Sequence, residues 1–147
     1  MRVRVALACL LVASAPLATG CQSQQDEYCS AVSDHQRDLT DITTGGGSDA
    51  LIKALPIFED LQGKAPSDVT DDWQQVVSRI KALDGALRTA GVDPASYDRD
   101  HPPAGVSAEE RTRIDAAARE LGSGPTVAAL QALDQEARDV CHTPLTM

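Results

Sequence analysis

The residues of this 147-residue chain that could bind a metal or transfer a proton are three histidines and the carboxylates near them. His35 lies among apolar residues at helical spacing, which favours a packed, hydrogen-bonded histidine, because zinc sites need three or four converging ligands. Residues 98–101, Asp-Arg-Asp-His, lack the ligand spacing of a calcium loop, which favours solvated loop charge. His142 has no recognisable partner in the sequence. The sequence therefore predicts no metal centre and no cofactor.

Motifs typical of enzymes are missing from the sequence. It contains no Gly-x-Ser-x-Gly elbow, phosphate-binding loop or dinucleotide fingerprint. The acidic pairs Asp71-Asp72 and Glu109-Glu110 stand where helices are expected to begin, and there they offset the positive end of the helix dipole. We therefore expect no catalytic residues. The alternative is a small envelope hydrolase or metal-dependent enzyme whose site is assembled only in three dimensions.

Residues 1–20 have the pattern of a secretory signal peptide. A basic start with Arg2 and Arg4 is followed by the mostly apolar run 5–18 and by small residues up to Gly20. This run is too short for a transmembrane helix, which needs about 20 apolar residues.

Residues 17–21, Leu-Ala-Thr-Gly-Cys, resemble the lipobox of bacterial lipoproteins, although Ala18 stands where this motif usually has a larger aliphatic residue. The resemblance implies cleavage before Cys21 and a diacylglyceryl group on its sulfur. Two acyl chains hold a protein stably on a membrane, so we expect an anchor at the extracytoplasmic face of the cell membrane. The alternative is an ordinary secreted protein cleaved near Ala15 or Gly20.

The number of cysteines fits lipidation. Cys9 leaves with the signal peptide, and an unmodified Cys21 would leave an odd count, hence a free thiol or an intermolecular bond. With Cys21 acylated, Cys29 and Cys141 form one pair in a compartment where disulfides persist. They are too far apart in sequence for a Cys-x-x-Cys redox pair, which favours a structural bridge.

The net charge of the mature chain narrows the classes of molecule that it could bind. Loss of Arg2 and Arg4 with the signal peptide leaves 11 basic and 22 acidic residues, a net charge of −11. This charge opposes binding to nucleic acid or to anionic lipid headgroups. The remaining length is that of one domain of about 125 residues.

Apolar residues recur at helical spacing in five segments, separated by glycine- and proline-rich breaks. Pro56 lies inside the second segment and is expected to kink it. We predict an all-α fold, a compact bundle of four to five helices with one long extended loop, closed by a disulfide. The expected organisation is a signal peptide at 1–20, a short lipid-anchored tether at 21–26 and a helical domain at 27–147. The predicted helices are 26–43, 49–62, 67–90, 107–121 and 125–140.

The Cys29–Cys141 bridge constrains the topology, because bridged Cα atoms lie about 4.4–6.8 Å apart. Five helices in strict alternation would leave these cysteines at opposite ends of the bundle. We therefore expect residues 92–106 to run back along the bundle as an extended crossing. The bridged end should face the membrane, because Cys21 is only eight positions from Cys29.

Several short motifs resemble a group of small, uncharacterised actinobacterial lipoproteins. The resemblance implies export, lipidation and a disulfide-bonded helical domain, and it carries over neither an activity nor functional residues. Besides the lipobox, these motifs are 27–29 (Glu-Tyr-Cys), 71–73 (Asp-Asp-Trp), 90–94 (Ala-Gly-Val-Asp-Pro), 102–105 (Pro-Pro-Ala-Gly) and 139–141 (Asp-Val-Cys).

Together these features predict a non-enzymatic binding or interaction module of the cell envelope. Its partner would be an envelope protein or a small ligand, and not a nucleic acid. The segment 98–101 and the second helix, which contains Pro56, are the least regular features, so we expect contacts there.

Overall fold

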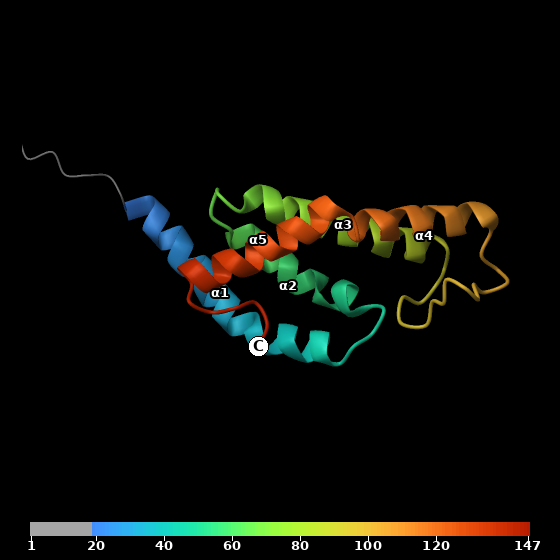
Figure 1. Cartoon of the computed structure of the whole chain (residues 1–147), viewed down its shortest axis with the longest axis horizontal. Helices are drawn as coiled ribbons and strands as arrows, with labels where there is room; N and C mark the ends of the chain where they lie inside the picture. Colours follow the sequence, from blue (N-terminus) through green and yellow to red (C-terminus); the bar gives the residue numbers. More distant parts are fainter. Residues whose placement is uncertain (1–18) are drawn as a thin grey trace, which may run out of the picture.

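The computed structural model describes the backbone of residues 19–147 and the side chains from Ser23 onward. Within these residues every regular element is a helix, which confirms the all-α prediction (Figure 1). The helices are α1 (Thr19–Thr44), α2 (Ala50–Lys64), α3 (Thr70–Thr89), α4 (Ala108–Leu121) and α5 (Gly124–Val140).

Helix α1 begins earlier than the sequence predicts. The predicted start was Asp26, but the helix already includes Thr19, so the expected tether 21–26 lies in its first turns. The rest of the signal peptide and the Cys21 side chain lie outside the described residues. In α2 the helix continues through Pro56 to Lys64.

Helix α3 is the centre of the core and packs against α2, α4 and α5. Its fully buried Trp73 donates an Nε1 hydrogen bond of 3.2 Å to the hydroxyl of the equally buried Tyr28 on α1. The Phe58 ring of α2 lies 5.5 Å from the Trp73 ring, centroid to centroid. The apolar residues that recur at helical spacing in this segment therefore form the buried face of α3. Its buried residues are Trp73, Val76, Val77, Ile80 and Leu87.

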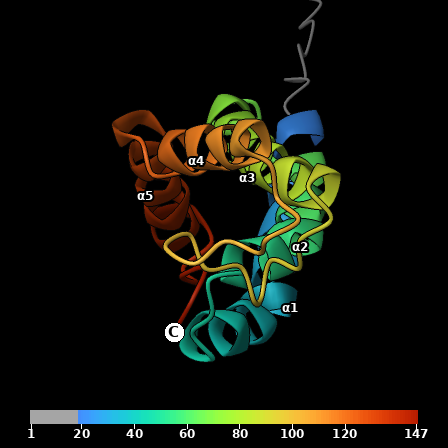
Figure 2. The same ribbon diagram turned by 90° about the vertical axis from the view of Figure 1, so that its right-hand side faces the viewer.

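The predicted extended crossing is wrong. Both ends of the loop between α3 and α4 lie at the same end of the molecule, and Figure 2, which looks at that end, shows the loop lying across it. Helices α4 and α5 follow one another in line and together run back along α3 (Figure 1). Arg79 of α3 lies 3.9 Å from Glu120 near the end of α4, and Gln75, one turn earlier, contacts Thr126 at the start of α5.

This arrangement brings Cys29 and Cys141 together in a different way from the one expected. The chain makes four passes, because α4 and α5 share the last one, so both ends of the domain meet without an extra crossing. The short connection of Gly122 and Ser123 breaks the helix but does not reverse it. The assumption that a short connection makes neighbouring helices antiparallel fails here, because both helices pack on α3 rather than on each other.

The junction of α4 and α5 is fixed by a buried hydroxyl. Thr126 is completely buried, and its Oγ1 donates to the Glu120 carbonyl at 2.9 Å. The same oxygen accepts a 3.1 Å hydrogen bond from Nε2 of Gln75 on α3. The hydroxyl therefore joins α3 to both helices of the last pass.

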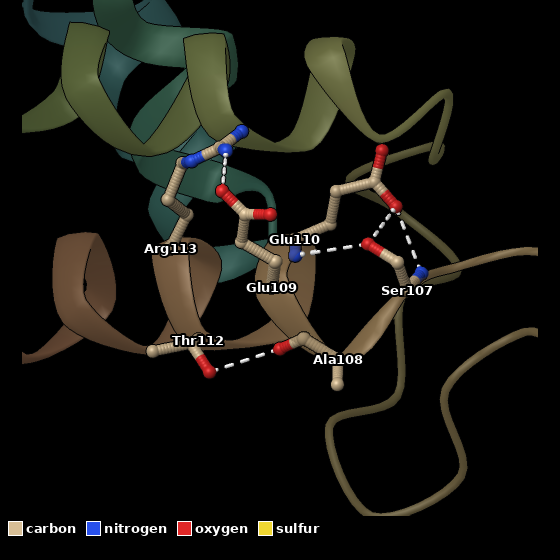
Figure 3. A network of polar contacts seen from close by, with 6 residues as sticks. All are labelled: Ser107, Ala108, Glu109, Glu110, Thr112 and Arg113. Carbon is tan, nitrogen blue, oxygen red and sulfur yellow. Dashed lines mark hydrogen bonds and ion pairs between the residues drawn. The ribbon is translucent and has the colours of Figure 1, made fainter.

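We expect Thr126→Val to destabilise the domain by about 1–3 kcal/mol, because the isosteric side chain leaves a carbonyl and an amide without their partner. The free energy of unfolding in urea would measure the effect. The matched control is Thr112→Val, since Thr112 is exposed and donates to the Ala108 carbonyl within α4 (Figure 3). The control should stay within about 0.5 kcal/mol of the parent. Equal effects of the two substitutions would contradict a special role for the junction.

The disulfide prediction is confirmed. Cys29 of α1 and Cys141 at the end of α5 are bridged, with their Cα atoms 5.0 Å apart. The tail after Cys141 then runs along α1: Gln36 Nε2 donates to the Pro144 carbonyl at 2.9 Å, and Leu145 is buried in the core. The bridge therefore fastens both α5 and a C-terminal strap, residues 142–147, to the first helix.

Candidate functional site

A recess of about 150 Å³ lies under the loop that connects α3 and α4. Its floor is aliphatic, with Leu87 and Ile114 almost completely buried and Leu83 half-buried. The α3–α4 loop that covers it lies at the end of the molecule remote from the start of α1 (Figure 1). It is lined by Ser48, Leu83, Leu87, Pro94, Tyr97, Arg99, Ile114, Asp115 and Ala118.

The first turn of α4 is held by its own side chains, which fixes the helix that carries Ile114 and Asp115. Ser107 Oγ accepts from the Glu110 amide at 3.2 Å, and the Glu110 carboxylate accepts from the Ser107 amide at 2.8 Å (Figure 3). This reciprocal capping box confirms the start of α4 predicted from the sequence. The Glu110 carboxylate also accepts from the Ser107 hydroxyl at 2.7 Å, and this hydrogen bond, followed by that from the Ser107 amide, lowers the pKa of the Glu110 carboxyl.

One ion pair stands at the edge of the recess. Arg99 Nε, from the loop, lies 2.9 Å from Asp115 Oδ1, from α4. The Arg99 side chain is 68% exposed and that of Asp115 is 29% exposed, so both reach solvent beside the aliphatic floor. The pair also ties the loop to α4, which keeps the recess covered on one side.

Segment 98–101, predicted to be solvated loop charge, folds into a turn around one carboxylate. Asp98 Oδ1 accepts from the Asp100 amide at 2.8 Å, and Oδ2 lies 3.0 Å from Nδ1 of His101. The hydrogen bond with His101, then that with Asp100, lowers the pKa of Asp98. Both side chains of this pair are largely exposed, so the turn presents Arg99 and takes no further part in the recess.

A second, wider recess of about 330 Å³ lies between α1 and α2. His35 lines it rather than lying in the core, and its Nε2 is 3.0 Å from Asp60 Oδ2. Lys64 contacts the other oxygen of Asp60. The hydrogen bond from Lys64, followed by that with His35, lowers the pKa of Asp60. The prediction of a hydrogen-bonded His35 is confirmed, and that of a core position is wrong. The lining residues are Glu27, Ser30, Ala31, Asp34, His35, Asp60 and Lys64.

The two recesses offer different chemistry. The one between α1 and α2 brings three carboxylates near an imidazole, although both oxygens of Asp60 are already engaged. The recess under the loop offers an aliphatic floor with one donor group and one acceptor group beside it. Among the residues with described side chains, no group of three or more His, Cys, Asp or Glu is arranged to hold a metal ion.

Neither the contact of His35 with Asp60 nor that of Arg99 with Asp115 could be predicted from the sequence. His35 and Asp60 are 25 positions apart, and Arg99 and Asp115 come from a loop and a helix whose approach depends on how α4 packs. Apart from the residue type of His35, the sequence signal was irregularity, since the two regions expected to make contacts, α2 and segment 98–101, each border a recess.

Comparison with known proteins finds no matching family model, no matching curated protein and no matching solved structure. In the described part of the chain, no helix combines the length and apolar character that crossing a membrane requires.

Proposed function

We propose that this protein is a lipid-anchored binding module at the extracytoplasmic face of the cell membrane, and that its ligand or partner binds at the recess under the α3–α4 loop. The observation that carries the proposal is the position of this recess. The loop that lines it lies at the end of the helical domain remote from the start of α1 (Figure 1), the helix that contains Cys21, the expected point of attachment.

Helix α1 sets the distance between the two ends. It has 26 residues, about 39 Å at 1.5 Å per residue, and Ser48, shortly after its end, lines the recess. Attached through Cys21, the domain would hold the recess away from the membrane and open to the envelope. The acidic charge of the mature domain opposes contact of its surface with anionic headgroups, whichever end faces them.

Crosslinking on intact cells tests the proposal. A photoreactive amino acid is placed at Ala118, which is exposed and lines the recess, or at Ala116, which is exposed on the same helix but does not line it. We expect adducts from position 118 and few or none from position 116. Equal labelling at the two positions, or none at either, would argue against a binding site at the recess.

A hydrolase remains the second candidate, and one observation favours it. The recess between α1 and α2 pairs His35 with Asp60 and adds Glu27 and Asp34. An esterase or phosphoesterase activity that His35→Ala removes and His101→Ala leaves intact would support this candidate over the binding module. His101 is the suitable control because it also pairs with an aspartate but is 85% exposed.

A further inference from the structure

Both residues of the Arg99–Asp115 ion pair beside the loop recess have polar atoms left that could bind a ligand. Arg99 contacts Asp115 through Nε alone, so the two terminal nitrogens of the guanidinium have no partner among the described residues. On Asp115 this contact involves Oδ1, so its Oδ2 is equally open. A carboxylate can bind the free edge of an arginine through two parallel hydrogen bonds, and an ammonium can donate to an aspartate oxygen.

The floor of the recess limits the size of an apolar group. Its volume of about 150 Å³ is close to that of an engineered protein cavity that binds one benzene molecule. Leu83, Leu87 and Ile114 supply aliphatic contacts, and the half-buried Tyr97 adds an aromatic wall. One aromatic ring or one branched aliphatic group would fill this space.

Charge around the recess selects against a ligand with a single charge. The carboxylates of Asp93, Asp98 and Asp100 belong to the loop that covers the recess, and their charge disfavours an anion there. A lone cation would in turn lie beside the guanidinium of Arg99. A ligand that carries both charges next to each other avoids both kinds of repulsion. It also matches the charges of the Arg99–Asp115 ion pair, which can stay intact when the ligand binds.

We propose that the recess under the loop binds a free amino acid, or an equivalent small zwitterion, with an aromatic or branched aliphatic side chain. Its carboxylate binds the terminal nitrogens of Arg99, its ammonium group donates to Asp115 Oδ2, and its side chain contacts Leu83, Leu87 and Ile114. This inference rests on the proposed function, because it assigns a ligand class to the same recess.

Three compounds that share a benzyl side chain test the charge requirement on the domain 23–147, purified with its disulfide intact. Phenylalanine carries both charges, N-acetylphenylalanine lacks the ammonium group and phenylalaninamide lacks the carboxylate. Titration followed by amide NMR shifts should give at least about tenfold weaker binding for each of the two analogues, since each loses a charge-assisted contact with Arg99 or with Asp115. Glycine, which has no side chain, should not bind measurably.

Substitutions locate the site. Arg99→Gln should weaken phenylalanine binding about tenfold and bring it to the level of phenylalaninamide, and Asp115→Asn should bring it to the level of N-acetylphenylalanine. The matched control is Arg113→Gln, because Arg113 is also half-exposed and paired with a carboxylate, Glu109, on α4 (Figure 3). The control should bind phenylalanine like the parent.

Three results would overturn the inference: no binding of phenylalanine, equal binding of the three compounds, or equal effects of Arg99→Gln and Arg113→Gln. Failure here is distinguishable from failure of the proposed function. If position 118 yields adducts on cells while phenylalanine does not bind, the recess is a binding site and the ligand class is wrong. If neither result is obtained, both proposals are wrong.

Discussion

We expect the double substitution Cys29→Ser/Cys141→Ser to lower the free energy of unfolding by about 2–5 kcal/mol, the usual cost of removing a native disulfide from a small domain. The bridge closes a loop across 112 positions of sequence. Loop entropy for about 100 residues corresponds to about 4.7 kcal/mol. For a domain of this size the melting temperature should fall by roughly 10 °C.

The double variant is preferable to Cys141→Ser alone, because it leaves no unpaired thiol at Cys29. Urea unfolding with and without a reductant gives the measurement: the reductant should lower the stability of the parent to that of the double variant and leave the variant unchanged. A parent insensitive to reductant, or a double variant as stable as the parent, would contradict a stabilising bridge.

A truncation separates the bridge from the strap that follows it. Removing residues 142–147 keeps the bridge but deletes the buried Leu145 and the hydrogen bond from Gln36 to the Pro144 carbonyl. Burial of one leucine side chain contributes about 1.5–3 kcal/mol, so the truncated domain should lose less stability than the double variant but remain sensitive to reductant. A truncated domain insensitive to reductant would mean that the bridge acts only by placing the strap.

The elements of the fold could be predicted from the sequence because they follow from local rules. The spacing of Trp73, Val76 and Ile80 predicts one buried face, and the capping box of Ser107 and Glu110 predicts the start of α4. The arrangement of α4 and α5 could not be predicted in this way. It depends on whether α5 packs against α4 or against α3, and this is decided by nonlocal contacts such as that of Gln75 with Thr126.

The candidate site shows the same difference between local features, which can be predicted from the sequence, and nonlocal contacts, which cannot. Single residues with unusual chemistry, such as His35, could be identified from their type. Their partners could not, because Asp60 reaches His35 only when α1 and α2 lie side by side. The recess under the loop gave still less signal: Leu87 and Ile114 look like ordinary core residues, and only the packed loop leaves space between them and Arg99.

Acyl labelling of cells should modify the parent protein and fail completely with Cys21→Ala, because the expected lipid is attached to the Cys21 sulfur. Mass spectrometry of the parent should show a chain that begins at residue 21 and carries a diacylglyceryl group. Cys29→Ser is the matched control, since it also removes a cysteine of α1 but should remain labelled. Labelling of Cys21→Ala, or an unmodified residue 21 in the parent, would contradict the lipid anchor.

Thiol counting gives an independent measurement of the same point. With Cys29 and Cys141 bridged, lipidation of Cys21 leaves the denatured, unreduced protein without a free thiol, whereas an unlipidated chain that begins at residue 21 would have one.

Lipidation of Cys21 also bears on the orientation proposed for the loop recess. Because helix α1 already includes Cys21, a lipid on this residue would join the membrane directly to the first turn of the domain, with no flexible segment between them. The recess would then be held at the end facing away from the membrane, and loss of the lipid would remove the reason for that orientation.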